Sequence, residues 1–229
     1  GIFCYCLYFS LENNFTVKKV SWLLLSFITI LLIRNFIAVI LLPCAIAWFV
    51  SKKYNLQSYK VFGILFITGI VATVFLHTYI KKADPLLIVV NKQQAFFSLG
   101  KANTNYKLDS LQTTAKSFVM LTPTALRHSF LSPLPGEFDN IYCNLLSAEI
   151  ILYWLLILLM LFYPAKNIFQ KNEFIVFGLV FTFLIFLFTG YITTNAGALI
   201  RYRSIYLTFL MVPVLCNVNW DRLMNKSTT

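Results

Sequence analysis

The chain has 229 residues, of which 59% are hydrophobic and only 12% are charged, with a formal net charge of +11. An ordinary soluble domain carries about 25% charged residues, so this composition disfavours a soluble protein. Long continuous apolar runs also disfavour a membrane β-barrel, whose strands alternate apolar and polar residues. We therefore predict an all-α fold, a polytopic transmembrane helical bundle with about six to seven spans.

The positive net charge raises the question of nucleic-acid binding. The sequence shows no nucleic-acid-binding fold signature and no basic amphipathic helix, so we predict no nucleic-acid partner. Basic loops facing anionic lipid and the cytoplasm explain the charge better, and they make the lipid bilayer the first expected partner. Scattered cysteines without a CxxC pair favour neither a disulfide framework nor a zinc site, and we predict no metal and no cofactor. The cysteines are Cys4, Cys6, Cys44, Cys143 and Cys216.

The first 80 residues are predicted to be N-terminal membrane helices. Residues 1–11 resemble the tail of a membrane helix, and no signal-peptide pattern precedes them. We expect this first helix to be truncated and earlier helices to be missing, so that the chain is a C-terminal part of a longer protein.

Residues 20–50 carry no charged or amide side chain except those of Arg34 and Asn35. A single helix over this range would be about 46 Å long, against a hydrocarbon core of about 30 Å, and would bury Arg34 at mid-depth. Two shorter spans, Phe15–Ile33 and Phe36–Val50, would place the arginine at the far interface instead, and we prefer this hairpin. A further span, Val61–Ile80, completes the region.

Residues 81–140 form a long polar connection, which we predict to be a periplasmic loop with an amphipathic segment. Leu86–Val90 has strand-like composition. Leu111–Leu131 has apolar residues at roughly helical spacing, interrupted by Pro123. Two interpretations stay open for that segment: an interface-lying or re-entrant segment, or an amphipathic helix that caps the bundle.

Residues 141–229 are predicted to be C-terminal membrane helices with a short cytoplasmic tail. The spans expected here are Ile141–Tyr163, Phe174–Ile192 and Ser204–Val218. We predict a loop over Thr193–Arg203, between the last two spans, because Asn195 and Gly197 give the backbone freedom to turn.

Alternating these spans divides the basic residues between two sides. By the positive-inside rule the lysine-rich side is cytoplasmic, which places the C-terminus inside and the long loop outside. The residues of the cytoplasmic side are Lys18, Lys19, Lys52, Lys53, Lys60, Lys166, Lys171, Arg222 and Lys226.

The arginines fall mainly on the other side. Arg34, Arg127, Arg201 and Arg203 are predicted to lie outside. A guanidinium group pairs bidentately with phosphate, which gives a reason for arginine over lysine. One hypothesis is that these arginines converge on a phosphate or pyrophosphate; the alternative is that each reaches the lipid headgroups independently.

Four further ionisable residues are candidates for chemistry. Glu149 lies inside a predicted span. It can act as a proton carrier, as an ion ligand or as a structural partner of Arg34 or Arg201. His128 can act as a general base or orient a phosphate, although a lone loop histidine is more often structural. Glu137 and Asp139 can act as acid and base or bind a metal, but such a pair is usually a solvated turn.

Two segments resemble motifs of a known family. Leu126–Pro135 resembles the stretch with an arginine and a serine- or glycine-proline turn that precedes a late span in bacterial surface-polysaccharide membrane proteins. Asn195–Arg203 resembles their N-x-G-x-x-x-R-x-R loop. The chain is thus similar to O-antigen polymerases and related glycan-assembly proteins. A tryptophan commonly follows the first motif, and Gly136 stands there instead.

The resemblance implies an inner-membrane protein that polymerises or transfers undecaprenyl-pyrophosphate-linked glycan at the periplasmic face, alongside other glycan-assembly proteins. It implies that Arg201 and Arg203 bind pyrophosphate, with Arg127 near the acceptor and Arg34 supporting. Fixed guanidinium groups would neutralise the leaving group. His128 or Glu137 would be the catalytic base for the acceptor hydroxyl.

Two other functional classes remain open. The chain can be a transporter or flippase subunit for an anionic lipid-linked solute, a class that Glu149 favours and the lack of a visible inverted repeat disfavours. It can also be a non-enzymatic membrane scaffold whose arginines meet headgroups.

Overall fold

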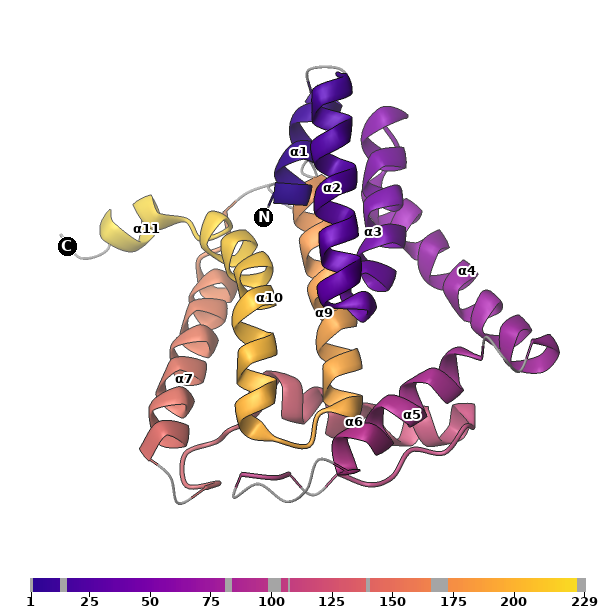
Figure 1. Ribbon diagram of the computed structural model, residues 1–229. Coiled ribbons are helices and arrows are strands. Elements are labelled where there is room, and N and C mark those ends of the chain that lie inside the picture. The colour runs from indigo at the N-terminus through magenta and orange to yellow at the C-terminus, as the bar shows by residue number, and fades with distance from the viewer. Residues whose placement is uncertain are drawn as a thin grey trace. The chain divides into compact units, whose positions relative to one another are not determined.

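The computed structural model describes residues 2–12, 16–80, 84–98, 104–106, 108–138, 141–165 and 173–225. Within them the chain is all-helical, with two isolated bridges and no strand (Figure 1). This confirms the all-α part of the predicted fold class. The helices are α1 (Ile2–Glu12), α2 (Val17–Ile33), α3 (Asn35–Lys53), α4 (Ser58–Tyr79), α5 (Pro85–Ser98), α6 (Ala115–Leu131), α7 (Ile141–Phe162), α9 (Glu173–Ile192), α10 (Ala196–Cys216) and α11 (Trp220–Asn225).

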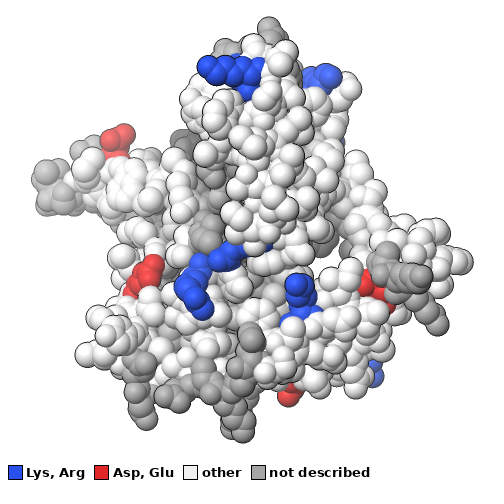
Figure 2. Space-filling view, viewed as in Figure 1, with Lys and Arg blue, Asp and Glu red and all other residues white. Residues whose placement is uncertain are grey.

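Among the described residues, four helices are long and apolar enough to cross a membrane: α3, α4, α7 and α9. α10 is bent by 52° between Ser204 and Tyr206 and makes a fifth if it is counted as one broken span. α1 and α2, with 11 and 17 residues, are shorter. Few charged side chains interrupt the face of the described chain that Figure 2 shows. The described residues therefore contain four or five candidate spans, whereas six to seven were predicted for the chain.

Some residues on which the predictions depend lie outside the described part of the chain. They are Lys81, Lys82, Asp139, Lys166, Lys171 and Lys226.

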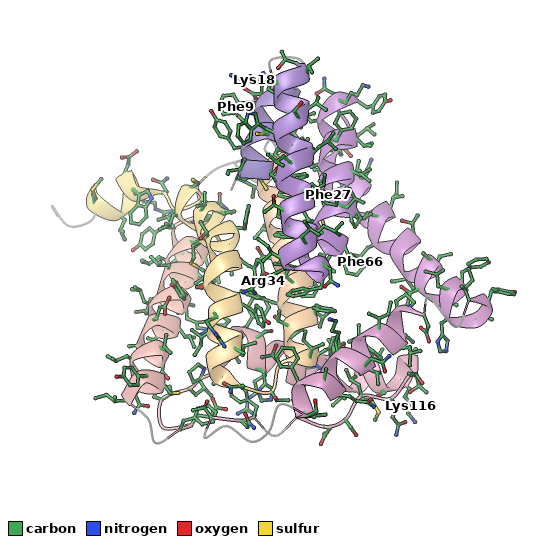
Figure 3. All side chains as sticks on the ribbon, in the orientation of Figure 1. Phe9, Lys18, Phe27, Arg34, Phe66 and Lys116 are labelled. Carbon is green, nitrogen blue, oxygen red and sulfur yellow. The ribbon has the colours of Figure 1, made fainter. Side chains whose placement is uncertain are left out.

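The described chain forms two compact units. The first contains residues 1–69 and 173–181, and the second residues 70–172 and 182–229. In the first unit α1 packs against α2 and α3, and α2 packs against α3. Arg34 separates α2 from α3, with φ −146° and ψ 78° (Figure 3). The predicted division of residues 20–50 into two helices at Arg34 is thus confirmed, but only α3 of the two is long enough to count as a candidate span.

The interior of the first unit is aromatic. The ring of Trp48 lies 5.0 Å from that of Phe177 and 5.2 Å from that of Phe174. At the edge of this cluster, Lys52 Nζ lies 3.7 Å from Glu12 Oε1 and 3.9 Å from Glu173 Oε2. One lysine thereby links α1, α3 and the start of α9.

In the second unit, α5 and α6 lie across the end of α9 (Figure 1). Val90, Leu111, Ala125, Tyr191 and Ile192 form their common core. The approach of α6 to α9 is very close, because a Cβ atom on Gly190 would lie 2.2 Å from the Ala125 carbonyl oxygen. A residue without a side chain is therefore needed at this crossing.

The strand-like interpretation of Leu86–Val90 is wrong, because these residues belong to α5. Asp84 Oδ1 accepts a hydrogen bond from Leu86 N at 2.9 Å, which satisfies one of the free donors at the start of a helix. Val90 is buried in the core described above. Local capping and tertiary burial outweigh the β-propensity of this segment. The helical spacing predicted for Leu111–Leu131 is confirmed from Ala115 onward by α6. The predicted interruption at Pro123 is wrong, because the helix continues through this residue.

The predicted loop over Thr193–Arg203 is also corrected. The loop is shorter, since α10 begins at Ala196. Asn195 caps it, with Oδ1 accepting from Gly197 N at 2.8 Å. The alanine and leucine residues that follow favour a helix, so Arg201 and Arg203 lie on helical turns.

Candidate functional site

The two motif segments meet in the structure. Arg203 Nη1, on α10, donates a hydrogen bond to the carbonyl oxygen of Ser132 at 2.7 Å. Ser132 is the C-cap of α6 and precedes Pro133. Arg203 and Ser132 are thus 71 residues apart in sequence and in direct contact in the fold.

A short segment, residues 104–106, holds the start of α10 against this contact. Tyr106 N donates to Thr194 O at 2.7 Å, and Ala196 N donates to Thr104 O at 3.0 Å. This pairing places the Tyr106 ring edge-on to His128, with ring centroids 4.5 Å apart. Tyr106 and His128 are both 7% exposed.

His128 is a buried histidine that has a free ring nitrogen. Its Nδ1 has no hydrogen-bond partner among the described residues. Burial lowers the pKa of His128 from its ordinary value of 6.5, against the opposing effect of the Glu137 charge. The imidazole is therefore neutral at pH 7 and can accept a proton. Burial raises the pKa of Tyr106, with the negative charge of Glu137 adding to the effect.

Glu137 closes the proline-rich turn. Its Oε2 accepts from Leu134 N at 2.8 Å, and its Oε1 accepts from the Ser132 hydroxyl at 3.5 Å. Glu137 N in turn donates to Leu134 O at 3.0 Å. This carboxylate holds the turn in place, and its charge acts on His128. Its partner in the sequence argument, Asp139, lies outside the described residues.

Arg203 also faces α7. It is 5% exposed, and the negative charge of Glu149 acts on its guanidinium group. The Tyr153 hydroxyl donates a hydrogen bond to Glu149 Oε1. Arg203 and Tyr153 line a narrow groove with about 20 Å³ of free space, which is about enough for one water molecule. The rest of its lining is apolar and includes Phe130, Ile150, Phe186 and Leu207.

The four predicted arginines occupy different environments. Arg203 is buried, whereas Arg201 is exposed and donates through Nε to Gly197 O at 3.3 Å, one turn back on α10. Arg127 is exposed on α6, beside buried His128. Arg34 belongs to the first unit. The structure therefore brings Arg203 to the first motif and leaves Arg201 and Arg127 available at the surface of the second unit.

Asn195 and Gly197 position the start of α10. Besides capping the helix, Asn195 Oδ1 lies 3.4 Å from the Thr104 hydroxyl. A Cβ atom on Gly197 would lie 3.3 Å from Asn195 Oδ1, which is a tight contact. Among the described His, Cys, Asp and Glu residues, no group of three is placed to hold a metal ion.

Sequence reasoning missed Tyr106 and Tyr153. Tyr153 follows Glu149 by four residues, a helical spacing that would have revealed it. Tyr106 carries no such signal, because backbone pairing with residues about 90 positions away places it.

Comparisons of the chain with protein-family models, with curated proteins and with solved structures give no match.

Proposed function

We propose that this chain belongs to an inner-membrane protein of bacterial surface-glycan assembly. It polymerises or transfers undecaprenyl-pyrophosphate-linked glycan at the periplasmic face. The observation that carries this proposal is the hydrogen bond from Arg203 to Ser132, since it joins the two arginine-containing motif segments. The candidate spans support a membrane location.

In this proposal the arginines of α10 hold the pyrophosphate. Arg203 is fixed by Ser132 and supplies an orienting positive charge, while exposed Arg201 meets the phosphates directly. Guanidinium groups pair bidentately with phosphate and neutralise charge that develops on a leaving group.

His128 is the proposed general base. The acceptor hydroxyl oxygen attacks the anomeric carbon, the bond to the pyrophosphate oxygen breaks, and the hydroxyl proton passes to neutral His128. Undecaprenyl pyrophosphate then leaves with the bonding electrons. The negative charge of Glu137 favours the imidazolium that forms. Glu137 itself is a positioning residue of the turn.

The test replaces Arg201 by lysine in the full-length gene of the native host. Arg201→Lys keeps the charge but removes the planar fork, so we expect shorter surface polysaccharide chains at an unchanged membrane protein level. The matched control is Arg222→Lys on α11, which should leave chain length unchanged. Normal chain length in Arg201→Lys would contradict pyrophosphate binding by this residue.

A second candidate function is transport of an anionic lipid-linked solute. The hydrogen-bonded pair of Glu149 and Tyr153, on a candidate span and beside Arg203, favours it. Glu149→Gln separates the two functions: it should abolish proton-coupled transport, whereas a polymerase that uses His128 should keep its long glycan.

A further inference from the structure

α6 presents two faces of opposite character. One face packs into the second unit through Ala125, His128 and Ser129, which are buried. The other face carries Val119 and Met120, which are 72% and 68% exposed, and Pro123, which is also exposed. Large apolar side chains exposed to this degree indicate a contact with something other than water.

Two cations border this apolar face. Lys116 lies one turn before Val119 and Met120, and Arg127 lies one turn after Pro123; both are exposed. Positions 116, 119, 120, 123 and 127 share one side of a helix. At 1.5 Å per residue, Lys116 and Arg127 are about 16 Å apart along the axis. We call this set of five residues the α6 stripe.

The charge pattern of the α6 stripe indicates which kind of surface it contacts. The sequence of α6 contains no acidic residue, so the α6 stripe is wholly cationic at its two ends. Long basic side chains reach phosphate groups while their stems stay on apolar surface. Apolar residues between them fit the boundary between headgroups and acyl chains.

We propose that the α6 stripe lies on the surface of an anionic lipid bilayer, parallel to the membrane plane. Val119, Met120 and Pro123 enter the headgroup boundary, and Lys116 and Arg127 pair with lipid phosphates. α6 has 17 residues and is not one of the candidate spans, as expected for a helix that lies on the membrane. Figure 3 shows Lys116 on α6.

This inference does not depend on the proposed enzymatic function. It assigns Arg127 to bulk lipid instead of to an acceptor glycan. It also places the candidate site near the membrane surface, because His128 and Ser132 lie at the end of the same helix, shortly after Arg127.

The test measures the environment of position 120 in the full chain, reconstituted into vesicles of phosphatidylcholine and phosphatidylglycerol. Cys6 and Cys216 are replaced by serine; Cys4, Cys44 and Cys143 are buried. A spin label is attached at Met120→Cys or, as control, at exposed Gln112→Cys. We expect the ratio of oxygen to aqueous nickel-chelate accessibility to be several-fold higher at position 120.

Removing the two charges tests whether Lys116 and Arg127 pair with lipid phosphates. With the label at position 120, Lys116→Gln with Arg127→Gln should raise nickel-chelate accessibility several-fold in anionic vesicles and much less in pure phosphatidylcholine. The matched control, Lys18→Gln with Arg222→Gln, removes two exposed charges elsewhere and should have no effect.

Two results would overturn the proposal. Equal accessibility at positions 112 and 120 would mean that α6 does not contact lipid selectively. Protection of position 120 from both oxygen and the nickel chelate would mean that protein covers it, for example a second copy of the chain.

Discussion

In the first unit the described interior is mainly aromatic and aliphatic, whereas the second unit buries many polar side chains. Ser10 and Ser51 are the buried polar residues of the described first unit. Those of the second are Asp84, Gln93, His128, Ser129, Ser132, Ser147, Thr182, Thr189, Thr193, Thr194, Arg203 and Asn217. Burying a polar group is costly unless it is hydrogen-bonded.

The two units differ in the interactions that stabilise them. Trp48 and its phenylalanine neighbours hold the first unit by apolar contact, and its ion pairs lie at least partly in solvent. In the second unit a single buried side chain, Gln93, donates to Asp109 O and Tyr191 O and accepts from Leu111 N. A unit that depends on buried hydrogen bonds has a specific geometry, which is what a functional site requires.

The largest expected effect is at the crossing of α6 and α9. Gly190→Ala places a methyl group 2.2 Å from the Ala125 carbonyl oxygen, so the helices must separate. We expect a loss of about 3 kcal/mol in the free energy of unfolding in detergent. Gly63→Ala on α4 is the control, because nothing lies within 4 Å of the added atom; it should be neutral or mildly stabilising. Equal effects of the two substitutions would contradict the close crossing.

The next effect tests the buried hydrogen bonds directly. Gln93→Leu keeps the approximate volume but leaves Tyr191 O and Leu111 N without their partner, at a cost of about 2 kcal/mol. Gln94→Leu alters an exposed neighbour and should change stability little. Thermal unfolding followed by circular dichroism measures both. If Gln93→Leu is neutral, the second unit does not depend on this side chain.

His128 gives a smaller effect, which depends on pH. The unfolded chain takes up a proton near the ordinary histidine pKa of 6.5, while the folded chain does so only at lower pH, because burial lowers the pKa of His128. Stability therefore falls as pH drops below 6.5. His128→Gln should flatten this fall, whereas the control Gln112→Ala, which changes an exposed residue and removes no titratable group, should retain it. Denaturant unfolding at a series of pH values between 7.5 and 5 tests the difference.

The smallest effect is expected in the first unit. Lys52→Met breaks two partly exposed ion pairs, with Glu12 and Glu173, and should cost about 0.5 kcal/mol. Lys18→Met removes an exposed lysine as the control. The effect of Lys52→Met should vanish at high salt; a loss that persists in salt would mean that packing by the lysine stem matters more than charge.

Features set by local sequence were predictable, and features set by distant contacts were not. The all-helical class follows from the length of the apolar runs, and the break at Arg34 follows from the cost of burying a cation at mid-depth. The strand-like prediction for Leu86–Val90 is wrong because it depends on local composition alone. That composition carries no information about the Asp84 cap or about the core that buries Val90. The prediction for Thr193–Arg203 is wrong because asparagine is common both in turns and at the N-cap of a helix, and Asn195 is the N-cap of α10.

The candidate site was predictable only in part. His128, Glu137 and Arg203 were selected from their sequence neighbourhood, and the structure brings them to one turn of the fold. That Arg203 turns inward while Arg201, two residues earlier, turns outward follows from helical geometry. The predicted loop gives no such orientation, because two side chains on a loop have no fixed angle between them.

The contact between Gly190 and Ala125 has a mechanical consequence. Two backbones that touch cannot slide past each other without first moving apart, so the crossing acts as a pivot. Ala125 lies one turn before His128 and two turns before Ser132 on a continuous helix and its cap. We therefore expect a tilt of the second part of α9 to move α6, and with it the Ser132 carbonyl group that accepts the hydrogen bond from Arg203.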